Sequence, residues 1–350
     1  MEYRRLGRSG LKVSVITMGT NTFGRNPGGA VNYVRGREAS RQVGQCLDAG
    51  VNLFDTADAY AGGASEEILG EALGRKRGDV LIASKVRFPL SERPNDTGTS
   101  RHHIIAACEG SLRRLGTDWI DLYQSHEWDG LTPLDETMEA FDRLIRDGKV
   151  RYIGCSNYAG WHIMKALGVA RAGDRQPFVS QQIHYSLESR DAEFELVPVA
   201  IDQGLGILVW SPLAGGLLTG KFRRGEDGPA GTRHFARGFI EPPIYDEDRL
   251  FAIVDALRAV GDEHGCSPAR IALAWLLHQP AVTSIIIGAR TTEQFADNLG
   301  AADVKLTAEE LAALDAVSRP NLPYPHWHHA FWARDRLGPA DRTLIDKYPA

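Results

Sequence analysis

The sequence predicts an α/β fold, and within that class a (β/α)8 TIM barrel. Short apolar segments alternate with helical patterns along the chain, and this alternation is typical of a parallel sheet. Eight strand segments fit within the 350 residues, and eight is the number that closes a barrel of this kind. A doubly wound sheet is the alternative, but no G-x-G-x-x-G motif opens a helix after the first strand.

The first predicted element is a β-hairpin over residues 2–14, in which "EYRRL" and "LKVS" flank the turn "GRSG". The predicted barrel strands follow at residues 13–19, 51–57, 80–85, 120–126, 150–157, 178–185, 206–212 and 283–289. Helical patterns follow most of them, at residues 38–49, 65–73, 100–115, 135–147, 161–171, 192–203 and 293–299. We therefore expect a single domain over residues 1–350, with the barrel at about 13–318.

The late helices begin at residues that cap helices well. Ser267, Thr291 and Thr307 each stand where a helical pattern starts, and their hydroxyl groups suit the N-cap position. Pro268 follows the first of them and suits the first helical position. The two threonines are each followed three residues later by Gln or Glu, which is the spacing of a capping box.

Two segments are longer than ordinary loops, at residues 214–248 after the seventh strand and in the tail at 319–350. The tail contains "PYPHWHHAFW", which concentrates aromatic rings and three histidines. It could close over a substrate as a lid, bind a metal through its histidines, or pack against the barrel or a neighbouring subunit. Packing is the simplest of these interpretations, and we predict no metal.

The composition excludes several classes of protein. Apolar residues make up 43% and charged residues 24% of the chain, which is enough for a large packed core. The net charge of -5 gives no reason to expect nucleic acid or an anionic membrane as a partner. No apolar run is long enough to span a membrane. The four cysteines are scattered without a C-x-x-C pair, which is compatible with a reducing cytoplasm, where we expect the protein.

Polar side chains stand at the ends of three predicted strands. Asp55 ends the second strand, Lys85 the third and His126 the fourth. Tyr60 follows shortly after Asp55 in the segment "FDTADAY". Active sites of (β/α)8 barrels lie at the carboxyl ends of the strands, so we expect these four side chains on one rim.

Each of these side chains also has an ordinary interpretation. An aspartate before threonine often forms a turn, a strand-end lysine is usually solvated, and a single histidine or tyrosine is more often structural. Together they favour acid–base chemistry, because an ammonium group beside a phenol stabilises the phenolate. Lys85 could do this for Tyr60, with Asp55 holding the lysine and His126 binding a carbonyl oxygen. Tyr60 would then protonate an oxygen as it becomes an alkoxide.

The sequence resembles the aldo-keto reductases over about residues 3–318. The shared blocks are "GVNLFDTADAYAGGASEEILGEAL", "LIASK", "IDLYQSHEWD", "GKVRYIGCSN", "SQQIHYS", "WSPLAGGLLTGK" and "IIIGARTTEQFADNLGA". The hairpin and "SPLAGGLLTGK" look more like the branch that contains potassium-channel β-subunits and bacterial general reductases than like the sugar and steroid reductases. The resemblance implies an NADPH-dependent barrel enzyme whose catalytic tetrad is Asp55, Tyr60, Lys85 and His126, with Tyr60 as the general acid.

The resemblance also implies a cofactor extended across the mouth of the barrel. The residues that would hold the nicotinamide and its ribose are Gly19, Thr20, Ser156, Asn157, Gln181 and Trp210. The residues that would follow the pyrophosphate, in the loop after the seventh strand, are Ser211, Leu213, Gly215, Leu217 and Lys221.

The last strand is expected to end at the adenosine side of the cofactor. The block "GARTTEQFADN" stands at this strand end and opens a helix capped by Thr291. Helix N-termini bind phosphate, and the Arg290 guanidinium can grip a phosphate through two hydrogen bonds. We therefore predict a 2′-phosphate here, and hence NADPH over NADH, with Gly288, Gln294 and Asn298 against this part of the cofactor.

We expect reduction of aldehyde or ketone carbonyls to alcohols, with Asn21, Phe23 and Trp128 beside the substrate. Asn21 stands where relatives often carry an apolar or aromatic residue, so a relative's substrate does not transfer to this chain. The alternative function is a cofactor-sensing regulatory subunit with slow turnover. A barrel lyase or isomerase would have no use for the nicotinamide-binding set. Homo-oligomerisation is left open by the sequence.

Overall fold

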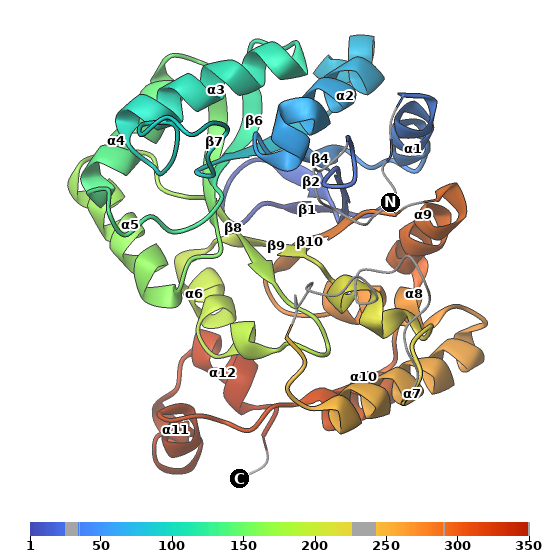
Figure 1. Cartoon of the computed structure of the whole chain (residues 1–350). Coiled ribbons are helices and arrows are strands. Elements are labelled where there is room, and N and C mark those ends of the chain that lie inside the picture. The colour runs from blue at the N-terminus through green and yellow to red at the C-terminus, as the bar shows by residue number, and fades with distance from the viewer. Residues whose placement is uncertain (25–33, 35, 226–242, 290, 349–350) are drawn as a thin grey trace.

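In the computed structural model of the chain, eight parallel strands close into a barrel (Figure 1). The strands pair in the order β10-β3-β4-β5-β6-β7-β8-β9, so neighbours in sequence are neighbours in the barrel. The predicted fold class is therefore confirmed. The structure describes residues 1–24, 34, 36–225, 243–289 and 291–348.

All but one of the barrel strands are shorter than the sequence pattern predicts, and β5 has the predicted length but is shifted by one residue. Their bounds are β3 Ile16–Gly19, β4 Leu53–Asp55, β5 Leu81–Val86, β6 Ile120–Ser125, β7 Val150–Ser156, β8 Ser180–His184, β9 Gly206–Trp210 and β10 Val282–Ile287.

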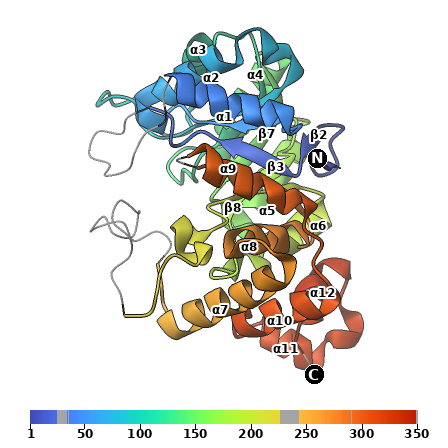
Figure 2. The same cartoon turned by 90° about the vertical axis from the view of Figure 1, so that its right-hand side faces the viewer.

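Helices surround the barrel and bury its outer face (Figures 1 and 2). Those of the barrel layer are α1 Gly36–Asp48, α2 Ala64–Leu73, α3 Arg101–Leu115, α4 Leu134–Arg146, α5 Gly160–Ala172, α6 Leu196–Gln203, α7 Glu247–His264, α8 Pro268–Leu277 and α9 Thr292–Leu299. After them come α10 Ala308–Ser318, α11 His326–Trp332 and α12 Pro339–Ile345. No helix in the described part of the chain is long and apolar enough to cross a membrane.

The predicted hairpin is present and closes one end of the barrel. It consists of β1 Tyr3–Arg5 and β2 Lys12–Ser14, paired antiparallel. Leu6 and Val13 are fully buried in a cluster with side chains from inside the barrel, such as Leu53. The turn needs Gly7, because its φ is 59° and a Cβ there would lie 2.4 Å from the Gly204 carbonyl oxygen. The polar site is therefore left to the opposite end.

The tail after α10 packs against the barrel layer. Lys347 Nζ lies 3.0 Å from Glu193 Oε2 in a largely buried ion pair. The Tyr348 hydroxyl donates to the Pro320 carbonyl oxygen at 2.6 Å, and α12 packs on α6. No group of three or more His, Cys, Asp and Glu side chains among the described residues could hold a metal.

Candidate active site

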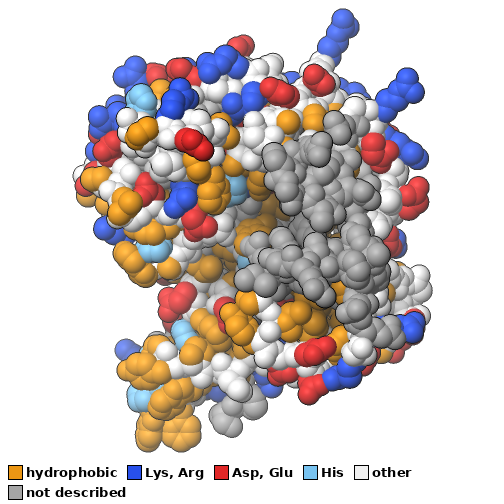
Figure 3. All heavy atoms as spheres, in the orientation of Figure 1, with side chains coloured by type: hydrophobic (Ala, Val, Ile, Leu, Met, Phe, Trp, Pro, Cys, Tyr) orange, Lys and Arg blue, Asp and Glu red, His pale blue; other side chains and the backbone are white. Residues whose placement is uncertain are grey.

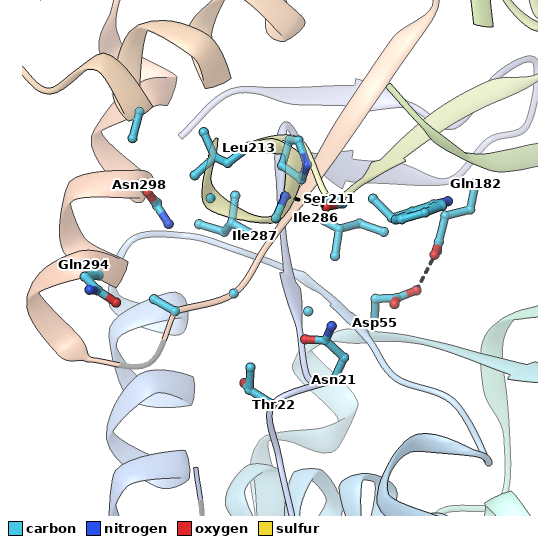
Figure 4. Close-up of a pocket in the computed structure, with 18 of the residues that line it drawn as sticks. Asn21, Thr22, Asp55, Gln182, Ser211, Leu213, Ile286, Ile287, Gln294 and Asn298 are labelled. Atoms are coloured by element: carbon cyan, nitrogen blue, oxygen red, sulfur yellow. Dashed lines mark hydrogen bonds between the residues drawn. The ribbon is translucent and has the colours of Figure 1, made fainter. Parts of the chain in front are cut away.

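A cavity of about 710 Å³ opens at the carboxyl ends of the barrel strands, a volume typical of small-molecule sites. Figure 4 shows Asp55 and Gln182 toward one end of it and Gln294 and Asn298 toward the other. The cavity is therefore elongated, with a polar floor at one end and helix α9 at the other.

Lys85 is the centre of the polar floor. It is the penultimate residue of strand β5, and its side chain is completely buried. Its ammonium group donates to Asp55 Oδ1 at 2.5 Å, to the Thr56 carbonyl oxygen at 2.8 Å and to the Tyr60 hydroxyl at 3.1 Å. The three protons of the ammonium group thus have three acceptors, and one of them is the phenol of Tyr60.

The charges around Lys85 keep it protonated. Burial disfavours the ammonium form and by itself would lower the pKa of the lysine. The nearby Asp55 carboxylate and the Tyr60 phenol outweigh burial and raise this pKa above its usual value. Lys85 is therefore a fixed positive charge that touches the Tyr60 oxygen at neutral pH.

Asp55 is held from both sides. Its Oδ1 faces Lys85, and its Oδ2 accepts hydrogen bonds from Gln182 Nε2 at 2.7 Å (Figure 4) and from Gln124 Nε2 at 3.5 Å. These partners come from β5, β8 and β6. The carboxylate therefore ties three strands together inside the barrel, where a lone charge would be costly.

A left-handed turn directs the Tyr60 hydroxyl back toward Lys85. Tyr60 begins a short 3-10 segment, and the next three residues, Ala61, Gly62 and Gly63, have φ values of 52°, 67° and 96°. Glycine adopts such angles freely, whereas Ala61 does so at a cost. Gly63 also has no room for a side chain, since a Cβ would lie 2.7 Å from the Arg114 side chain.

His126 forms the wall beside Tyr60. Its ring stands edge-on to Tyr60, with centroids 5.6 Å apart, and edge-on to Phe88 at 4.7 Å. Burial, together with the charges of Lys85 and Arg87, holds the pKa of His126 well below its usual range. The imidazole is therefore neutral, and it can donate one hydrogen bond without adding a charge.

Asn157 joins the ends of three strands on the other side of the floor. Its backbone is left-handed, with φ 56°. Its Nδ2 donates to the His126 carbonyl oxygen at 3.1 Å, and its Oδ1 accepts from Trp210 Nε1 at 2.9 Å. This orientation fixes the Trp210 indole at the cavity wall, where it also contacts the ring of His184.

Comparison with known proteins identifies the family of the chain. Residues 15–319 match the sequence model of the aldo/keto reductase family. The chain belongs to the aldo/keto reductase family. It is 41% identical over 328 residues to the uncharacterized oxidoreductase YrpG of Bacillus subtilis, and this alignment covers 91% of the chain and 96% of that protein.

Two further relatives show the range of the similarity. A probable voltage-gated potassium channel subunit beta from Oryza sativa is 38% identical over 91% of this chain and 96% of its own length. Versiconal hemiacetal acetate reductase from Aspergillus parasiticus is 32% identical over 93% of this chain and 99% of its own length. The expected resemblance to both the channel subunits and the reductases is therefore confirmed.

In this aldo/keto reductase the predicted tetrad forms one cluster. Asp55, Tyr60 and His126 line the cavity, and Lys85 lies directly behind them. Most of the expected cofactor residues also line the cavity, namely Gly19, Ser156, Asn157, Trp210, Ser211, Leu213, Gly215, Lys221, Gly288, Gln294 and Asn298. Arg290 lies outside the residues that the structure describes.

The structure corrects the expectation for Gln181 by one residue. Gln182 lines the cavity, whereas Gln181 points outward and donates through Nε2 to the Leu196 carbonyl oxygen at 2.6 Å. Successive side chains of a strand face opposite sides, so only one of the two adjacent glutamines can face the barrel interior. Gln182 is the one, as its bond to Asp55 shows.

Two other expected cofactor residues do not reach the cavity. Thr20 is fully buried, and its hydroxyl bonds to the Asp55 carbonyl oxygen at 3.0 Å and to Ser65 Oγ at 2.8 Å. Leu217 packs in the hydrophobic core and is 4% exposed. Both support the cavity wall from behind. Gly216 and Thr219 line the cavity on either side of Leu217.

Of the three expected substrate residues, one lines the cavity and two do not. Asn21 lines the cavity, but Phe23 is fully buried in the core. Trp128 does not line the cavity, because its ring stacks on that of His162, with ring centroids 3.9 Å apart and ring planes inclined by 6°. Apolar contact with neighbouring elements decided both positions, and the sequence pattern did not reveal it.

Sequence reasoning missed two residues beside His126. Phe88 and Glu127 both line the cavity. Glu127 directly follows His126, so its position beyond the end of β6 was a usable signal. Phe88 belongs to the loop after β5 and carried no pattern of its own.

Proposed function

We propose that this aldo/keto reductase reduces aldehydes or ketones to alcohols, with NADPH as the hydride donor and Tyr60 as the proton donor. One observation carries the proposal: the Tyr60 hydroxyl lines the cavity and lies 3.1 Å from the buried, charged Lys85. A phenol in water is a weak acid at neutral pH. Contact with a fixed ammonium group is what makes its proton available.

The residues divide the work as follows. The neutral His126 and the Tyr60 hydroxyl can both donate hydrogen bonds to a carbonyl oxygen between them, because their rings meet edge-on. As this oxygen gains negative charge, Tyr60 gives up its proton and Lys85 stabilises the phenolate left behind. Asp55 orients Lys85 and balances its charge. In the reverse direction the phenolate is the base.

Features of the cavity lining support the proposal of a dinucleotide cofactor, which when bound would supply the hydride. Gly215 and Gly216 line its wall with φ values of 64° and 101°, so the wall there has no side chains and the backbone can approach a ligand closely. Lys221 adds a cation to the same stretch. Gln294 and Asn298 line the far end from α9. Our preference for NADPH over NADH rests on the sequence position of Arg290 before this helix.

A regulatory subunit that senses the cofactor is the second candidate function. The observation that favours it is the similarity to potassium channel β-subunits from two plants and a yeast, at 36–38% identity. The intact Asp55, Tyr60, Lys85 and His126 cluster favours the enzyme, since a cofactor sensor would not require a proton donor.

The four free cysteines suit the reducing cytoplasm that we propose as the location of this protein.

The test compares the wild-type protein with Tyr60→Phe on a panel of carbonyl compounds, by the loss of NADPH absorbance. Since the polar Asn21 and Glu127 and the aromatic Phe88 all line the cavity, the panel should include hydroxylated as well as apolar carbonyls. We expect wild-type turnover of at least one compound and a fall of about 10²–10⁴-fold in Tyr60→Phe.

NADPH binding by fluorescence is the control, and it should be the same in both proteins. Failure of the wild-type protein to bind NADPH would overturn the proposal that it is an NADPH-dependent reductase. Equal turnover by the variant would show that another group supplies the proton. Binding without turnover of any compound on the panel would favour the regulatory subunit.

A further inference from the structure

The tail presents an aromatic surface to solvent. Tyr324, Trp327, Phe331 and Trp332, which we call the aromatic face, are 75%, 50%, 72% and 69% exposed. In Figure 3 hydrophobic side chains gather over α11, at the lower left of the molecule. Large apolar side chains scattered singly on a surface are ordinary, but a contiguous group of them marks an interaction site.

The aromatic face does not belong to the proposed catalytic machinery. None of its four residues lines the cavity, so the lid interpretation of the tail has no support in the described residues. The match to the family model also ends at residue 319, before the face begins. Its aromatic rings therefore need an explanation other than the chemistry of the barrel.

The aromatic face rests on a well-anchored support. The His326 ring stacks on Phe194 with centroids 5.6 Å apart, and this fixes the start of α11 to the barrel layer. At the other end, Arg334 donates to the Ile345 and Tyr348 carbonyl oxygens. Because the helix is already held in place, little conformational entropy is lost when a partner binds the face.

The area of the face fits a second copy of the chain. A large aromatic side chain buries about 150–250 Å², so the exposed parts of the four rings offer roughly 500 Å² together. Two such faces packed together would bury about 1,000 Å², which is the smallest area expected of a specific protein interface. One face alone against an ordinary polar surface would not give this apolar contact.

Composition and charge favour the same partner. The α11 sequence "HWHHAFW" has aromatic rings and no Lys, Arg, Asp or Glu, as in the centre of protein interfaces. Asp335 and Arg336 lie next to it and are both exposed. In a two-fold contact the same patch meets itself, so Asp335 of one copy can lie against Arg336 of the other. A membrane is disfavoured, because α11 lacks the basic residues of lipid-binding helices.

We propose that the aromatic face is the contact surface of a symmetric homodimer, in which α11 of one copy packs against α11 of a second copy. A two-fold contact uses the face of each copy once, so assembly stops at two chains. The proposal concerns a surface away from the cavity, and it does not depend on the proposed catalytic function.

The experiment is sedimentation equilibrium of the full chain over a range of concentrations. We expect the wild-type protein to be a dimer at tens of micromolar. Phe331→Glu should raise the dissociation constant of the dimer by about 30-fold or more. Trp161→Ser is the matched control, because Trp161 is 62% exposed on α5, outside the face, and this variant should dimerise like the wild type. Trp332→Ser is the second face variant and should weaken the dimer as well; circular dichroism verifies that each variant is folded, and Trp332→Ser alone decides the test if Phe331→Glu does not fold.

Three outcomes would overturn the proposal. These are a monomeric wild-type protein at all concentrations, dimerisation that both face variants leave unchanged, and loss of the dimer in Trp161→Ser but not in the face variants. A monomer that floats with phosphatidylserine vesicles would assign the face to a membrane instead. A wild-type assembly larger than two chains is a fourth outcome that would overturn the proposal, because it contradicts the two-fold arrangement.

Discussion

Asp55 is the residue on which the polar centre of the barrel depends. It is 2% exposed, and it is the counter-charge of the completely buried Lys85. Breaking such a pair on one side leaves the other charge uncompensated, which costs about 3–5 kcal/mol. Its second oxygen binds Gln182 and Gln124, so the same carboxylate also holds two uncharged neighbours. Stability and the position of the Tyr60 proton are therefore coupled through one side chain.

The two adjacent glutamines of β8 provide a matched pair of substitutions. Gln182→Leu removes the hydrogen bond to the Asp55 carboxylate, and such a bond to a charged group contributes about 1.5–3 kcal/mol. We expect kcat/KM for carbonyl reduction to fall by roughly 10–100-fold, since Asp55 and Lys85 lose part of their alignment.

Gln181→Leu is the control for this prediction. It removes only the bond to the Leu196 carbonyl oxygen outside the barrel. Its kcat/KM should stay close to the wild-type value, while its free energy of unfolding falls by about 1 kcal/mol. The reverse result, with Gln181→Leu the more damaging variant in the kinetic assay, would restore the original assignment.

At the residue scale, the structure places residues where the sequence predicted them when their position depends only on the end of a strand. Asp55 ends β4, Lys85 lies one residue before the end of β5 and His126 one residue beyond the end of β6, and the barrel brings all such ends together. The face of the strand that a side chain occupies is harder to predict, because an error of one residue moves the side chain to the other face. Two glutamines in a row gave no signal about which one faces inward, and only the pairing with Asp55 decides it.

At the element scale, helix starts are well encoded by local residues. Ser267 Oγ accepts from the Arg270 amide at 3.1 Å, and Thr291 Oγ1 accepts from the Gln294 amide at 3.3 Å. The turn after Tyr60 was not predictable in this way. Its left-handed run includes Ala61, for which the sequence offers no rule, and its shape depends on contact with α3 through Gly63.

The cap of α10 gives a prediction at this scale. Thr307 Oγ1 accepts from the Glu310 amide at 3.2 Å, and Glu310 Oε2 accepts in return from the Thr307 amide at 2.7 Å. Thr307→Ala removes one half of this capping box and should lower the free energy of unfolding by about 1 kcal/mol, measured by urea denaturation. Thr307→Ser keeps the hydroxyl and should lie near the wild type. Equal losses in both variants would mean that the methyl group, and not the cap, matters.

At the scale of the whole molecule, the barrel and its hairpin follow from counting strand–helix units and from the turn "GRSG". The tail does not follow from such counting. Its helices are short, and they are held by contacts with distant residues, such as the pair of Lys347 with Glu193. The sequence could therefore suggest that the tail packs somewhere, but not that it lies on α6 with its aromatic rings exposed.

A buried acid near the site should make global stability depend on pH. Asp58 is fully buried, and burial together with the nearby charge of Glu66 raises the pKa of its carboxyl to about 8. The folded protein therefore holds this proton, while an unfolded chain releases it near pH 4. Between these values the unfolded state binds fewer protons, so the free energy of unfolding falls as pH rises, by about 1.4 kcal/mol per pH unit.

Asp58→Asn tests this sign, because the amide has a similar shape and no proton to lose. The free energy of unfolding, from urea titrations at pH 5.5, 6.5 and 7.5, should shift in favour of the variant at each step upward. Below pH 4 the contribution of Asp58 is constant, so the difference between the two proteins should stop changing there. Asp129→Asn is the control: burial raises the pKa of Asp129, but hydrogen bonds from Thr132 and from backbone amides outweigh this and lower it, so its contribution changes only below about pH 4. The curves of this variant and of the wild type should therefore run parallel from pH 5.5 to 7.5. Parallel curves for the wild-type and Asp58→Asn proteins would show that Asp58 is already ionised in the folded state and that neighbouring cations, such as Arg114, compensate its charge.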